Sequence, residues 1–237
     1  GHDARKPRLP VEVTMIEIQL PKTLLVAALV YLFPSFSQAE LVGVPDAIRS
    51  TLGTTDANGA LMIDGQSAHA IEALRAFYRA RRYEPAWVSA DGVNSQADAL
   101  LSALDNVGSH GLRQETYHRS AITERLPEVR ELVASGSPVE PESVAGLDLL
   151  LSDAFLTLGI RLIRGRVNPE TMHPTWNAPR RRADLVAALE QALSQHRVVD
   201  TLEELGPRQA GYQRLREGLA RYRALAVAGD WRSLDEG

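Results

Sequence analysis

The chain has 237 residues, of which 44% are hydrophobic and 24% are charged, a composition typical of one sizeable globular domain or two small ones. Its formal net charge is −4, so it lacks the overall basic character of most nucleic-acid-binding proteins, and no nucleic-acid partner is predicted. It contains no cysteine, which excludes disulfide bonds, a lipid-anchored cysteine and a cysteine nucleophile.

Residues 1–39 are predicted to be an upstream extension followed by a secretory signal peptide. The apolar run Thr23–Phe33 is followed by the small residues Ser37 and Ala39 at the −3 and −1 positions, which predicts cleavage after Ala39. A core helix is the alternative interpretation of the apolar run. The run is much shorter than the roughly 20 residues that cross a bilayer, so no stable membrane span is expected.

Residues 40–66 are polar and glycine-rich, and they are predicted to be mostly a loop that leads into a helical domain over residues 67–237. The first predicted helix begins near Ser67, which is a plausible N-cap, and ends before Pro85. Its apolar residues recur at three- and four-residue spacing, as expected for one buried helix face: Ile71, Leu74, Phe77 and Tyr78.

Two further helices are predicted before the middle of the chain. Residues 94–108 form a helix that Asn94 or Ser95 caps and Gly108 ends. A loop follows, and residues 119–136 are then helical on both sides of Pro127, which is expected to kink or split the helix.

The longest predicted helix extends from about Pro141 to Arg164. Apolar residues occur on nearly all of its faces, so we expect it to lie at the centre of the fold. Arg161 and Arg164 fall in its last turn, where cations favour the exposed carbonyl groups, and Gly165 is the expected C-cap.

After a connector that contains Pro169 and Pro174, the pattern predicts helices near residues 181–196, 200–206 and 212–231. Almost no alternation of apolar and polar residues indicates a strand. The predicted fold class is therefore all-α, an irregular multi-helix bundle of six to seven helices around a central long helix.

The sequence predicts no catalytic residue, cofactor or metal site. The six histidines form no HExxH pair and have no familiar metal-ligand spacing, and no phosphate-loop or dinucleotide fingerprint is present. A helical muramidase-like enzyme with two carboxylates across a cleft remains an alternative, because 30 acidic residues leave that arrangement open.

Four stretches in a fixed order carry a resemblance to a known family: "FYRARRYEPAW" (77–87), "HGLRQETY" (110–117), "LLLSDAFLTLGIRLIRGRVNPETMHPTW" (149–176) and "YQRLREGLARYRALAVAGDW" (212–231). Together they resemble the N-terminal helical scaffold domain of the large periplasmic murein L,D-transpeptidases. The resemblance covers essentially all of residues 67–231. Asn168 stands where that family is expected to have aspartate, and both residues suit a turn.

The resemblance implies a role in cell-wall biogenesis. In that family the scaffold domain precedes a small peptidoglycan-binding domain and a catalytic domain, whose cysteine thiolate forms 3→3 cross-links in peptidoglycan. This chain has no cysteine and ends about where the next domain is expected. We therefore expect a periplasmic, non-catalytic scaffold portion, which is a truncated product, a fragment or a separate subunit.

The expected partners are the peptidoglycan-binding and catalytic domains of the parent enzyme, and peptidoglycan itself. The alternative function is a stand-alone exported helical module that binds peptidoglycan or a partner protein. The candidate docking surface comprises residues in or beside the non-helical connectors, where interaction residues concentrate: Tyr83, Trp87, Arg166 and Trp176. The alternative is that these side chains pack the connectors onto the helices.

Overall fold

The computed structural model describes residues 41–136, 138–165 and 181–229. The predicted signal peptide, Arg166 and Trp176 lie outside these residues. Within them the chain forms eight α-helices, two short 3-10 helices and two two-stranded antiparallel sheets, which confirms the all-α fold class. The helices are α2 (Val44–Gly53), α3 (Ile71–Ala80), α4 (Gln96–Asp105), η1 (Val107–His110), η2 (Gln114–Tyr117), α5 (Arg119–Ala134), α6 (Pro141–Arg164), α8 (Leu185–Ser194), α9 (Val198–Leu205) and α10 (Ala210–Ala228).

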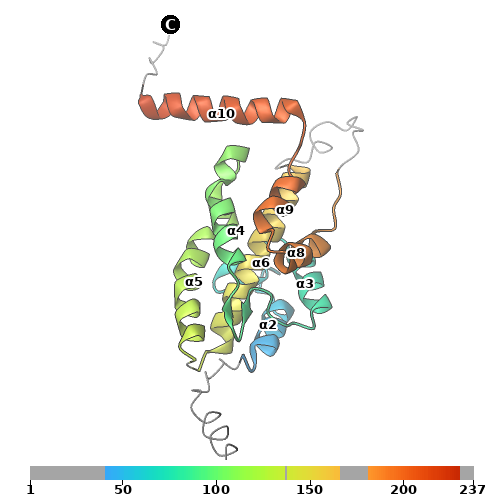
Figure 1. Ribbon diagram of the computed structural model, residues 1–237. Coiled ribbons are helices and arrows are strands. Elements are labelled where there is room, and N and C mark those ends of the chain that lie inside the picture. The colour runs from blue at the N-terminus through green and yellow to red at the C-terminus, as the bar shows by residue number, and fades with distance from the viewer. Residues whose placement is uncertain (1–40, 137, 166–180, 230–237) are drawn as a thin grey trace, which may run out of the picture. The chain divides into compact units, whose positions relative to one another are not determined.

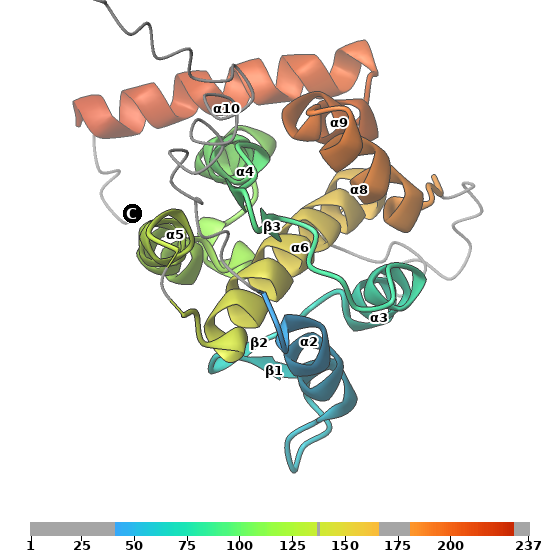
Figure 2. The same ribbon diagram turned by 60° about the horizontal axis from the view of Figure 1, so that its bottom comes forward.

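Helix α6 lies at the centre, as its sequence predicts. Every residue from Val144 to Gly159 is buried, and α2, α3, α5, α8 and α9 all pack against it (Figures 1 and 2). Among the described helices, α6 alone is long and apolar enough to cross a membrane. However, 89% of its most apolar window is buried inside the protein, as in the core helix of a globular domain.

The ends of α6 follow its capping residues. Pro141 occupies the first turn, where its fixed φ suits a helix and its missing N–H costs no hydrogen bond. Gly165 ends the helix with a φ of 74°, and its N–H donates to the Arg161 carbonyl at 2.9 Å. Both boundaries agree with the sequence prediction.

Helix α2 corrects the predicted loop over residues 40–66. Val44, Ile48 and Leu52 are spaced four residues apart, so their side chains lie on one face, and all three are buried. That face packs against α6. The helical domain therefore begins before Ser67, and the structure has more helices than the sequence predicts.

Two short hairpins flank α3. Strands β1 (Met62–Ile63) and β2 (Gln66–Ser67) are joined by Asp64 and Gly65, whose φ values of 49° and 78° are the two positive values that a type I′ turn requires. Strands β3 (Val88–Ser89) and β4 (Gly92–Val93) form the second hairpin. Ser67 therefore belongs to β2 and is not the N-cap of α3.

Two other boundaries differ from prediction. Helix α5 continues through Pro127, so the proline does not split it. Helix α8 begins only at Leu185, because Asp184 is its N-cap and accepts a hydrogen bond from the Ala187 N–H at 3.0 Å.

Candidate docking surface

A buried carboxylate on α6 holds the connector that follows α3. Asp148 is fully buried, and its Oδ1 accepts hydrogen bonds from the Tyr78 hydroxyl at 2.6 Å and from the Ala86 N–H at 2.8 Å. Its Oδ2 accepts from the N–H groups of Trp87 at 2.8 Å and Val88 at 3.1 Å. A single α6 side chain therefore fixes the connector to the central helix.

Burial raises the pKa of both acids in this cluster, Asp148 and Tyr78. Desolvation raises the pKa of the Asp148 carboxyl, while the Tyr78 hydroxyl and three backbone N–H groups favour its ionised form and oppose that rise. Burial also raises the pKa of Tyr78 well above its usual value. Tyr78 thus keeps its proton and can donate it in a hydrogen bond.

A second α6 carboxylate, Asp153, ties together the starts of α3 and α5. It accepts hydrogen bonds from the N–H groups of His69, at 3.0 Å to Oδ2, and Ala70, at 2.8 Å to Oδ1. Its Oδ2 lies 2.8 Å from Nε2 of His118, the buried N-cap residue of α5. The His69 ring stacks on the His118 ring with centroids 5.4 Å apart. Because Asp148 and Asp153 are both fully buried, these chemically conspicuous groups stabilise the fold and form no open acid/base pair.

The two predicted docking residues within the described part of the chain, Trp87 and Tyr83, differ in their surroundings. Trp87 is only 1% exposed, and its Nε1–H donates to the Ser152 Oγ at 2.9 Å. The prediction that Trp87 belongs to a docking surface is therefore wrong, since its indole packs the connector into the core. Tyr83 is partly buried, with a positive φ of 67° and the Arg49 guanidinium 4.7 Å from its ring centroid.

A different surface, on α10, has the character of a docking site. None of the residues of this described helix is buried. Leu215 is 73% exposed, Tyr222 is 64% exposed and Leu225 is 44% exposed. Leu215 and Tyr222 are seven residues apart, so they lie on the same side of the helix. We call Leu215, Tyr222 and Leu225 the α10 face.

Polar contacts attach a neighbouring side of α10 to η1. The Tyr212 hydroxyl lies 2.7 Å from His110 Nδ1, and an Arg216 guanidinium N–H donates to the Ser109 Oγ at 3.0 Å. Arg223 donates to the Gly108 carbonyl. Figures 1 and 2 show α10 lying across the end of the bundle where α4 and α9 finish. The helix is thus anchored on one side and presents an apolar face on another.

Sequence periodicity identifies the apolar residues of α10 but not their surroundings. Tyr212, Leu215, Leu219 and Tyr222 recur as in a core-facing helix. Among the described residues no group of histidines and acids could hold a metal ion, and the chain has no cysteine. The α10 face itself consists of large exposed hydrophobic side chains.

A family model described as "Scaffold domain" matches residues 72–219, well over half of the chain. The match includes most of α3, all of α6 with its two buried carboxylates, and the first half of α10. No curated protein and no solved structure matches the chain.

Proposed function

Since the chain belongs to the family of L,D-transpeptidase scaffold domains, we propose that it is the non-catalytic scaffold portion of an enzyme that forms 3→3 cross-links in peptidoglycan. Its partners are the peptidoglycan-binding and catalytic domains of that enzyme. The exposed apolar α10 face is the observation that carries the docking role. Large exposed apolar side chains grouped on one surface are typical of interaction sites.

The scaffold role needs a rigid body and an accessible surface. The fully buried Asp148 and Asp153 supply rigidity, because they hold the start of α3, the connector after it and the start of α5 on one central helix. The α10 face supplies the surface. The exposed Arg214 and Arg221 lie beside this face, so the preferred partner surface is apolar with an acidic rim.

The chemistry of cross-linking requires a partner. Acyl transfer from a murein tetrapeptide by this family's route uses a thiolate, and the chain contains no cysteine. The purified chain alone is therefore expected to form no cross-links. Detection of 3→3 cross-links made by this chain without a partner would contradict the proposal.

The proposal places the protein in the periplasm, after export with cleavage behind Ala39. N-terminal sequencing of secreted material is expected to begin at Glu40. Uncleaved chain retained in the cytoplasm would count against export.

The docking role is tested by mixing the chain with a separately expressed fragment from the same source that contains the peptidoglycan-binding and catalytic domains. Calorimetry is expected to detect binding that Leu215→Glu and Tyr222→Glu weaken at least tenfold, since a charge replaces an apolar contact. Gln213→Glu is the matched control, because it adds the same charge to another exposed position of α10.

Circular dichroism separates loss of docking from loss of folding. All three variants are expected to retain the helical signal of the wild type, because the substituted positions are exposed. Trp176→Ala and Arg166→Ala test the two predicted docking residues that lie outside the described part of the chain. Wild-type affinity in both glutamate variants of the α10 face would refute docking through that surface.

A further inference from the structure

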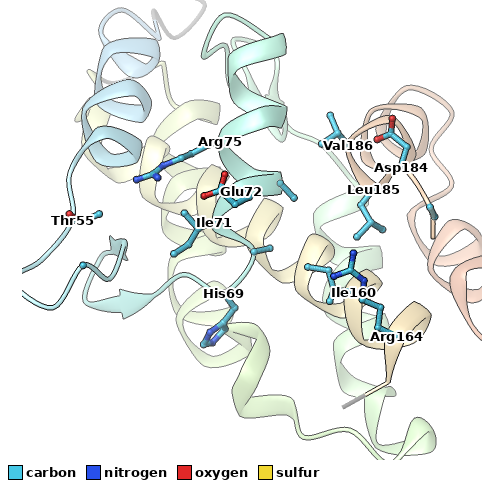
Figure 3. Close-up of a pocket in the computed structure, with 14 residues that line it drawn as sticks. Thr55, His69, Ile71, Glu72, Arg75, Ile160, Arg164, Asp184, Leu185 and Val186 are labelled. Carbon is cyan, nitrogen blue, oxygen red and sulfur yellow. The ribbon is translucent and has the colours of Figure 1, made fainter. Parts of the chain in front are cut away.

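Two hollows meet at Arg75 on the outer side of α3. The smaller has a volume of about 340 Å³ and is lined by Arg49, Leu52, Gly53, Arg75, Arg79 and Tyr83. The larger has a volume of about 610 Å³, and Arg75, His69 and Arg164 contribute cationic or titratable groups to its wall (Figure 3). Because Arg75 lines both, the two hollows lie next to each other, and we call them together the Arg75 site.

Positive charge predominates in the Arg75 site although the chain as a whole has a net charge of −4. Among the described residues that line the smaller hollow, three are arginines and none is acidic. Arg75 uses its Nε–H to donate to the Leu52 carbonyl at 3.0 Å, which fixes the guanidinium between α2 and α3. Arg49 is 3.7 Å from Asp46, at the far end of the ion-pair range, and its side chain is 59% exposed.

The larger hollow has a mixed lining. Ile71, Ile160, Leu185 and Val186 give it an apolar wall, and Figure 3 shows Glu72 beside Arg75 on α3. Its other acid, Asp184, already accepts the Ala187 N–H as the N-cap of α8. The hollow therefore combines arginines, aliphatic side chains and one carboxylate, Glu72, for which the described part of the chain shows no partner.

This lining favours a peptide that carries free carboxylates. The planar guanidinium group of arginine pairs with a carboxylate through two parallel hydrogen bonds. The carboxylate of Glu72 can pair with the amino group of such a peptide. It repels a ligand whose only charged groups are phosphates. The volumes lie in the range of about 300 to 1,000 Å³ that is usual for sites of small ligands.

We propose that the Arg75 site binds the stem peptides of peptidoglycan, with ligand carboxylates on Arg75 and Arg79 and the aliphatic part of the peptide along the wall of the larger hollow. This assignment rests on the proposed function, which places the chain beside peptidoglycan. Through the Arg75 site the scaffold binds the substrate polymer directly, at a place separate from the α10 face. Tyr83, predicted as a docking residue, lines the smaller hollow together with Arg49, whose guanidinium lies against its ring.

The test uses a soluble disaccharide–tetrapeptide fragment of peptidoglycan and the same fragment with its carboxylates amidated. Calorimetry with the full chain is expected to show binding that amidation weakens at least tenfold. An equal concentration of inorganic phosphate is expected not to displace the fragment. Equal affinity for the amidated fragment, or displacement by phosphate, would overturn the assignment to peptide carboxylates.

Variants locate the binding. Arg79→Gln leaves the Arg75 to Leu52 hydrogen bond in place and is expected to weaken binding of the fragment at least fivefold, with a further loss in Arg75→Gln/Arg79→Gln. The matched control is Arg113→Gln/Arg208→Gln, which removes the same charge from exposed positions that line neither hollow and is expected to keep wild-type affinity. Unchanged affinity in Arg79→Gln, with the wild-type helical signal, would refute the site.

The two proposals fail in different ways. If the catalytic fragment binds the chain but the disaccharide–tetrapeptide does not, the Arg75 site is wrong and the scaffold role stands. If the disaccharide–tetrapeptide binds but the catalytic fragment does not, the scaffold role is wrong, and the chain acts as a peptidoglycan-binding module.

Discussion

The carboxylate of Asp148 accepts the backbone N–H of Trp87 at 2.8 Å, although the two residues are 61 positions apart in the chain. The indole of Trp87 then donates to Ser152, one turn further along the same helix. The connector after α3 is thus held by both its backbone and its side chain. This double attachment makes the connector part of the core and predicts its response to substitution.

Asp148→Asn is expected to lower the free energy of unfolding by about 3 kcal/mol, measured by urea denaturation. The amide NH₂ would face backbone N–H groups that now donate to a carboxylate, and a buried donor without an acceptor costs about 1–3 kcal/mol. The control is Asp46→Asn at a site whose side chain is 83% exposed, and a change there within about 0.5 kcal/mol is expected. A loss as small in Asp148→Asn as in the control would contradict the anchoring role.

Trp87→Ala is expected to lower the free energy of unfolding by about 3–5 kcal/mol, as for other buried aromatic residues. In a variant that keeps Trp87 and replaces Trp176 and Trp231 with phenylalanine, we expect blue-shifted emission that acrylamide quenches poorly. Emission at the wavelength of free tryptophan would show that Trp87 is exposed and would restore it as a docking candidate.

Gly146→Ala is expected to destabilise the protein although alanine is the better helix former. An added Cβ would lie 1.8 Å from Oδ2 of Asp64, which also pairs with Arg125 at 3.2 Å. We expect a loss of about 1–3 kcal/mol in thermal or urea unfolding, the usual cost of overpacking. Gly218→Ala on α10, where a Cβ meets nothing within 4 Å, is the control and should gain up to about 1 kcal/mol.

The same pair of residues allows a rescue experiment. Asp64→Gly is expected to restore most of the stability of Gly146→Ala, because it removes the overlapping carboxylate and glycine tolerates the φ of 49° at that turn. A double variant no more stable than Gly146→Ala alone would show that the loss has another cause.

Leu151→Asp tests the central position of α6. Leu151 has no exposed surface. An unpaired charge there is expected to lower the free energy of unfolding by about 4 kcal/mol or more, or to prevent folding. Leu215→Asp, on the 73% exposed side chain of α10, is expected to leave the melting temperature nearly unchanged. Wild-type-like melting of Leu151→Asp would exclude a central α6.

The free energy of unfolding is expected to decrease as the pH falls below about 6.5. Desolvation lowers the pKa of His69, against the opposing charge of Asp153, and it also lowers the pKa of His110. Each histidine therefore binds protons more readily when unfolded, so its contribution is complete above the unfolded pKa and is lost as the pH falls through the folded one. Urea denaturation at pH 7.5 and 5.5 is expected to show a smaller pH effect in His69→Gln/His110→Gln, and an equal effect in both proteins would contradict this origin.

Local sequence signals were sufficient to predict a helix when its own residues show an apolar pattern and mark both of its ends. Pro141 and Gly165 mark the first turn and the C-cap of α6, and the apolar residues between them predicted burial on all sides. The family resemblance also followed from ordered local stretches, and the match over residues 72–219 confirmed it. Shorter signals were present but missed: the four-residue spacing of Val44 and Ile48 in α2, and the Asp64-Gly65 pair of a type I′ hairpin.

Only the tertiary structure decided which side chains face the core, because burial depends on contacts between residues far apart in the chain. Trp87 was predicted to dock and Tyr222 belongs to the apolar pattern of the last helix. However, Trp87 reaches the carboxylate and hydroxyl of α6, and Tyr222 meets no covering helix among the described residues. Contacts between distant residues also bring Arg49 and Arg79 to the hollow that Tyr83 lines. Helix α2 packs beside α3 through contacts with α6 that no local pattern encodes, and this packing converts separate arginines into one site.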